Sequence, residues 1–165
     1  MQVVPQTDVT VIGFDTSRAG QSGGFVDVER LDWLAEQIES ATGPTVVAMH
    51  HPPFRTGIDW MDALGFDDLE SLQQVLTAHP ATRVIAGHFH RPISSQIGAT
   101  PVSVGIATAP HVALDLSNAA VPAIINDPIG YQLHCVTNDP SPMVISHTRY
   151  IDRASVPQPI QLNLG

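Results

Sequence analysis

Histidines that follow two hydrophobic segments are the residues of this sequence best suited to chemistry. His50 directly follows the run TVVAM, and both His88 and His90 follow the run RVIAG. Neutral imidazole is the commonest side-chain ligand for metals and suits zinc, iron and similar ions. Each run is typical of a buried strand, and ligand sites of open α/β sheets form at the carboxyl ends of the strands. We therefore expect His50, His88 and His90 to meet at one metal site.

The local pattern of segment 87–90 favours this convergence. Residues two apart on an extended segment point to the same side, so His88 and His90 are predicted to face one site. Gly87 is expected to take a backbone conformation closed to other residues and to allow close approach. The other histidines, apart from His111, are predicted to be ordinary hydrogen-bonded residues: His51, His79, His134 and His147.

The elements that position these histidines follow from hydrophobic periodicity. Strands are predicted at 9–15, 45–49 and 83–87, and amphipathic helices at 26–40, with Asp27 as its N-cap, and 67–79. Residues 50–57 are expected to be irregular because two prolines there cannot donate hydrogen bonds to a sheet. Short strands are predicted to follow at 93–98, 101–105, 131–137 and 143–151. This order predicts an α/β layer that continues into an antiparallel sheet, an α/β (α+β) fold.

Composition narrows the class of protein. The 165 residues suit one domain, 43% of them are hydrophobic, and the formal net charge is -9. This acidic balance disfavours a nucleic-acid scaffold and an electrostatic membrane anchor. Neither an apolar run of about 20 residues nor a signal-peptide pattern is present, so no membrane span and a cytoplasmic location are expected. The single cysteine, Cys135, is predicted to be a buried structural thiol.

The two histidine motifs together resemble those of a known family. The pair MHHPP and GHFH is similar to the last two motifs of the calcineurin-like metallophosphoesterases. The wider text from Val9 to Asp115 resembles class III 3′,5′-cyclic nucleotide phosphodiesterases and glycerophosphodiesterases. The resemblance implies a layered β-sandwich flanked by helices, of which residues 1–152 are the C-terminal half, with 153–165 as an extended C-terminal arm.

The resemblance also implies an activity and its residues. Members of the family hydrolyse phosphate esters at a centre of two divalent ions (Mn, Fe or Zn), with a bridging hydroxide that attacks phosphorus, and here the expected reaction is phosphodiester hydrolysis. By position, His50 and His88 would share one ion and His90 would hold the second, with His51 just outside the coordination sphere. His111 would be a further contact to the phosphate, or alternatively a turn residue. The expected substrate is a phosphodiester small molecule.

The chain departs from the family in its carboxylates. The motifs Asp-x-His, Gly-Asp-x-x-Asp and Gly-Asn-His are absent, and Asp15 is predicted to be a strand-end turn residue. Three neutral imidazoles do not balance two divalent charges, so the centre is expected to be incomplete in this chain alone. A homo-oligomer, or a second chain that completes the site, is therefore predicted. Two alternatives remain: a single zinc on the three histidines, and a catalytically silent fragment or interaction module.

Overall fold

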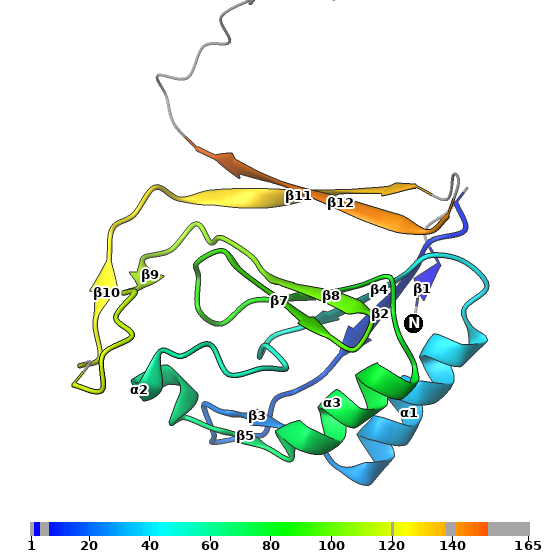
Figure 1. Ribbon diagram of the computed structural model, residues 1–165, viewed down its shortest axis with the longest axis horizontal. Coiled ribbons are helices and arrows are strands. Elements are labelled where there is room, and N and C mark those ends of the chain that lie inside the picture. The colour runs from blue at the N-terminus through cyan, green and yellow to red at the C-terminus, as the bar shows by residue number, and fades with distance from the viewer. Residues whose placement is uncertain (1, 4–6, 120, 138–140, 152–165) are drawn as a thin grey trace, which may run out of the picture.

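A six-stranded sheet with strand order β1-β2-β4-β6-β8-β7 forms the centre of the molecule (Figure 1). The computed structural model describes residues 2–3, 7–119, 121–137 and 141–151. Strands β2, β4, β6 and β8 run parallel, and β1 and β7 pair antiparallel at the two edges. The strands are Gln2–Val3 (β1), Thr10–Phe14 (β2), Thr45–Met49 (β4), Arg83–Ala86 (β6), Ile93–Ile97 (β7) and Thr100–Val104 (β8).

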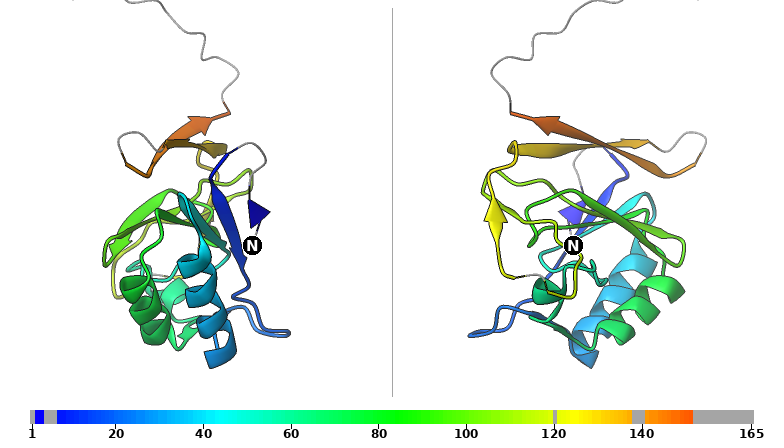
Figure 2. Two further views of the ribbon diagram at one scale, coloured as in Figure 1. Left: turned by 90° about the vertical axis from the view of Figure 1, so that its right-hand side faces the viewer. Right: turned by 60° about the vertical axis from the view of Figure 1, so that its left-hand side comes forward.

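Two helices cover one face of this sheet, α1 (Val28–Ser40) and α3 (Leu69–Ala78) (Figures 1 and 2). The predicted cap of α1 is confirmed, since a carboxylate oxygen of Asp27 accepts a hydrogen bond from the backbone N–H of Arg30 at 2.9 Å. Each helix buries its leucine stripe against the sheet, and Leu34 and Leu72 are both 0% exposed. The core therefore lies between the helices and the parallel strands.

The remaining elements are short, apart from one hairpin. They are β3 (Gly24–Phe25), α2 (Asp59–Asp62), β5 (Phe66–Asp67), β9 (His111–Val112), β10 (Ile124–Ile125), β11 (Gly130–Thr137) and β12 (Met143–Tyr150). The antiparallel hairpin β11–β12 lies over the sheet on the side away from the helices (Figures 1 and 2). Arg83, at the start of β6, links the sheet to this hairpin, because its guanidinium donates a hydrogen bond to the carbonyl of Val144 on β12 at 2.9 Å.

The predicted mixed α/β architecture is confirmed, including the strand over residues 45–49 and the irregular segment after it. The predicted order of strand, helix, strand, helix and strand up to residue 87 is observed among the longer elements, and the short elements β1, β3, α2 and β5 are additional to it. No helix in the described ranges has the length and apolar character that a membrane span requires. The predicted boundary at residue 152 and the arm over 153–165 fall outside the described residues, so they stay predictions.

Cys135 corrects one prediction, because its thiol is exposed rather than buried. On β11 the odd-numbered residues point away from the sheet, and the exposed Leu133 lies on the same side. The opposite side of the hairpin carries Val144, which is 5% exposed and pairs with Val136. The apolar stretch predicted burial, but strand alternation directs this thiol outward.

Candidate metal centre

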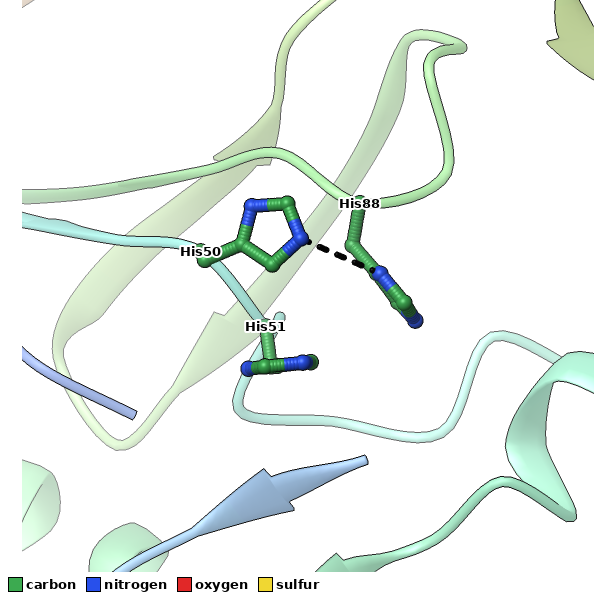
Figure 3. Close-up of side chains that lie close together, drawn as sticks. All are labelled: His50, His51 and His88. Carbon is green, nitrogen blue, oxygen red and sulfur yellow. Dashed lines mark hydrogen bonds between the residues drawn. The ribbon is translucent and has the colours of Figure 1, made fainter. Parts of the chain in front are cut away.

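The structure brings His50 and His88 together. His50 directly follows β4 and His88 lies two residues beyond the end of β6, and these neighbouring parallel strands end at the same edge of the sheet. The Nε2 atom of His50 lies 3.3 Å from Nδ1 of His88 (Figure 3). This is the geometry expected from the sequence, since parallel strands bring the residues after their carboxyl ends to one place.

The backbone of the second motif differs from the prediction. His88 and His90 have φ angles of 70° and 59°, so both lie in the left-handed region and the segment is not extended. Gly87 is not among the residues with positive φ, and a Cβ there would meet His50 Nδ1 at an ordinary 3.6 Å. The predicted need for glycine at this position is therefore wrong. Left-handed backbone at a non-glycine residue costs roughly 1–2 kcal/mol, and such strain concentrates at functional sites.

His51 joins the pair, so three imidazoles form one cluster. One ring nitrogen from each of His50, His51 and His88 lies within 4.8 Å of the others. His51 is buried, its Nδ1 lies 2.8 Å from the hydroxyl of Thr16, and its Nε2 lies 3.1 Å from the carbonyl of Ser22. Both ring nitrogens of His51 thus have protein partners, as expected of an ordinary hydrogen-bonded histidine. The family resemblance placed His51 just outside the coordination sphere, whereas strand spacing alone did not predict its contact with the other two.

His90 lies beside the cluster but not in it. Its Nδ1 lies 2.9 Å from the backbone carbonyl of Pro110, and because a carbonyl only accepts, this nitrogen carries the proton. Its Nε2 is then the unprotonated nitrogen, and metal-binding histidines usually donate their other N–H in this way. His90 is among the neighbours that lower the pKa of His88, so the two rings are electrostatically close. A metal on His90 stays a prediction.

Burial favours the neutral form of two histidines of the cluster, His88 and His51. The pKa of His88 falls from 6.5 to about 4, first because burial penalises the charged ring and then because His51, His50 and His90 lie nearby. Burial is also the main cause that lowers the pKa of His51. Metals bind the neutral imidazole, so at neutral pH His88 has no proton to lose before it binds a cation.

The lowered pKa of His88 predicts how stability depends on pH. Because the unfolded chain takes up the proton near pH 6.5 and the folded chain only near 4, the free energy of unfolding decreases as the pH falls through this window. Urea unfolding in the presence of a chelator, at pH 7.5 and at pH 5, measures the decrease. His88→Asn should reduce the dependence on pH, whereas replacement of the exposed His147 should not. An unchanged dependence in His88→Asn would assign the effect to other groups.

Carboxylates are absent from this cluster in the part of the chain that the structure describes. Asp15 is exposed at the end of β2, and its carboxylate accepts hydrogen bonds from the backbone N–H of Ser17 at 2.8 Å and from its hydroxyl. The position after β2 and the two bonds to Ser17 confirm Asp15 as a strand-end turn residue, and the same bonds lower its pKa. The neutral imidazoles suit part of the coordination sphere of one divalent ion. They do not by themselves fit a pair of divalent ions, which needs anionic ligands.

His111 is a buried polar residue near this edge. It lies on β9, directly after Pro110, and is 2% exposed. Its Nδ1 lies 3.9 Å from the carboxylate of Asp127, and its Nε2 has no hydrogen-bond partner among the described residues. Buried polar atoms normally have a partner, so the unpaired Nε2 is notable. The predicted contact between His111 and a phosphate stays a prediction.

Comparisons with known proteins identify phosphodiesterases as relatives. The chain is 31% identical to a probable glycerophosphodiester phosphodiesterase of Arcobacter nitrofigilis, over 99% of this chain and 60% of the relative. It is 33% identical to a cAMP/cGMP dual specificity phosphodiesterase of Mycobacterium tuberculosis, over 59% of this chain and 31% of the relative. It is 32% identical to a 3′,5′-cyclic adenosine monophosphate phosphodiesterase of Pseudomonas aeruginosa, over 59% of this chain and 36% of the relative.

These matches cover only part of each relative. The chain spans at most 60% of their lengths. No family model matches the chain. The relatives nevertheless confirm the resemblance that the histidine motifs predicted, because both kinds of phosphodiesterase named from the sequence are among them.

Proposed function

We propose that this chain provides the histidine side of a divalent-metal centre in a calcineurin-like metallophosphoesterase that hydrolyses phosphodiesters. The chain is then a phosphoric diester hydrolase, or the C-terminal half of one. The substrate is a small phosphodiester of the cyclic nucleotide or glycerophosphodiester kind. The similarity to a glycerophosphodiesterase extends over 99% of the chain, against 59% for the two cyclic nucleotide enzymes described above. We propose the cytoplasm as its location, on the sequence pattern alone.

One observation carries this proposal. Two histidines from neighbouring strands have ring nitrogens 3.3 Å apart, on a backbone held in the left-handed region at His88. Burial keeps His88 neutral at physiological pH, which is the form that binds metals. A structural histidine needs none of these features, and their coincidence at one sheet edge supports a ligand site.

The residues of this chain have distinct roles in the proposed centre. His50 and His88 would hold one ion and His90 would hold a second, with Mn, Fe or Zn as the candidate metals. A bound divalent metal supplies a Lewis acid and an activated water for attack on phosphorus. Pro110 fixes the ring of His90 through its carbonyl at 2.9 Å. His111 would donate its unpaired Nε2 proton to a phosphate oxygen.

The missing carboxylates must come from elsewhere if the centre is dinuclear. We propose that another segment or another chain supplies them, and that the chain therefore associates with a second copy or with a completing chain. The absence of carboxylates from the described cluster also supports the alternative, a silent or interaction module that retains part of the fold.

Metal analysis and a phosphodiester assay test the proposal. The chain is incubated with Mn²⁺ or Zn²⁺, desalted and assayed with bis(p-nitrophenyl) phosphate, with and without a chelator. We expect bound metal and chelator-sensitive hydrolysis. Bound metal without hydrolysis would support an incomplete centre, and addition of the carboxylate-bearing part of a relative should then restore activity. A chain that binds no metal would exclude the proposed function and support the silent module.

A further inference from the structure

Thr16 and His51 face each other because of the sheet register. Phe14 of β2 pairs with Met49 of β4, and Thr16 and His51 each lie two residues beyond that pair. The two side chains are 1% and 6% exposed, so little of either side chain is open to solvent. A hydroxyl and an imidazole buried together need each other as partners, because an unpaired buried polar group is costly.

The hydrogen bonds around His51 define its tautomer. The carbonyl of Ser22 only accepts, so Nε2 of His51 carries the proton and donates at 3.1 Å. Nδ1 is then unprotonated and accepts from the hydroxyl of Thr16 at 2.8 Å. The same hydroxyl oxygen accepts from the backbone N–H of His51 at 3.3 Å. Thr16 therefore contacts both the ring and the backbone of this histidine.

The ring fixed in this way lies against both histidines of the proposed ligand pair. Its centroid lies 4.8 Å from that of His50, with the rings nearly perpendicular, and 4.7 Å from that of His88. Figure 3 shows the ring of His51 beside the other two, with the dashed contact between His50 and His88. A rotation of His51 would push against both neighbours, so its orientation limits theirs.

We propose that Thr16 is a positioning residue. It holds the ring of His51 in place as a non-coordinating neighbour that packs against His50 and His88. The inference rests on the proposed metal site. The Thr16 hydroxyl occupies the one nitrogen of His51 that is free of a proton, and so keeps it from binding the cation. The orientation of the ring then sets the separation of the two ligand nitrogens. Residues outside the coordination sphere that orient ligands typically change metal affinity 10–100-fold when replaced.

Two replacements of Thr16 separate this role from simple packing. Thr16→Val keeps the shape and removes the hydroxyl, and it should weaken Zn²⁺ binding by about 10-fold. Thr16→Ser keeps the hydroxyl and removes a methyl group, and it should bind Zn²⁺ as the unchanged chain does. Thermal unfolding in a chelator identifies a variant that fails to fold, in which case Thr16→Ala replaces the valine variant. Equal zinc affinities of the serine and valine variants would overturn the proposal.

Nitrogen NMR of the histidine rings measures the chemical shifts of the ring nitrogens, which report on protonation and hydrogen bonding rather than on packing. In the metal-free chain, the resonance of His51 Nδ1 should show a hydrogen bond that is retained in Thr16→Ser and lost in Thr16→Val, while the carbonyl of Ser22 keeps Nε2 protonated in every variant. On addition of Zn²⁺, the ring nitrogens of His50 and His88 should shift, while Nδ1 of His51 should not. A zinc-induced shift at His51 Nδ1 would overturn the inference. If no ring responds to zinc, the proposed metal site fails, while the Nδ1 resonance of His51 in the metal-free variants still tests the contact with Thr16.

Discussion

Replacement of His88 by alanine is expected to weaken zinc binding to this chain by at least about 100-fold, the upper end of the range for supporting residues around a metal. His88 offers a ring nitrogen 3.3 Å from that of His50, and burial holds the pKa of His88 near 4, so the ring is neutral when the metal arrives. Alanine removes one of the two proposed ligands, whose ring nitrogens the structure places together. Calorimetric titration with Zn²⁺ at pH 7.5 measures the loss.

A matched replacement controls for the loss of any histidine. His147 lies on β12 and is exposed, away from the cluster, so His147→Ala should leave zinc affinity unchanged. His50→Ala should equal His88→Ala, and the double variant should lose little more than either single one, because residues that act as a unit are not additive. Zinc affinity that survives both single replacements would contradict the proposed ligand pair.

Leu34→Ala is expected to lower the free energy of unfolding by about 3 kcal/mol, within the range for large-to-small core replacements. Leu34 is 0% exposed on the face of α1 that covers the sheet, and it belongs to the same core cluster as Ile12 and Val47. Truncation leaves a cavity between the helix layer and the parallel strands, which close packing cannot fill without strain. Urea unfolding monitored by circular dichroism measures the change.

An exposed leucine provides the comparison for this core variant. Leu114 is 59% exposed, so Leu114→Ala should change the free energy of unfolding by less than about 0.5 kcal/mol. Equal effects of the two replacements would show that α1 does not contribute its leucine stripe to the core. The layered arrangement would then need revision.

Most of the elements could be predicted because their signals are local. The run TVVAM gave the bounds of β4, and Asp27 gave the start of α1, since β-branched runs and capping side chains act within a few residues. The side that a residue faces was harder to predict. Cys135 lies in an apolar stretch but points outward, because the hairpin uses the other side of β11 to face the sheet.

The sequence by itself determined that histidines follow two buried strands, and that parallel neighbours bring His50 and His88 to one edge. Only the tertiary structure decided which histidine completes the cluster. Spacing favoured His90, yet left-handed backbone at His88 and His90 turns the segment, and the register of β2 against β4 places Thr16 opposite His51. Contacts of this kind depend on loop dihedral angles and strand register, which arise when distant segments pack together and leave no periodic signal along the chain.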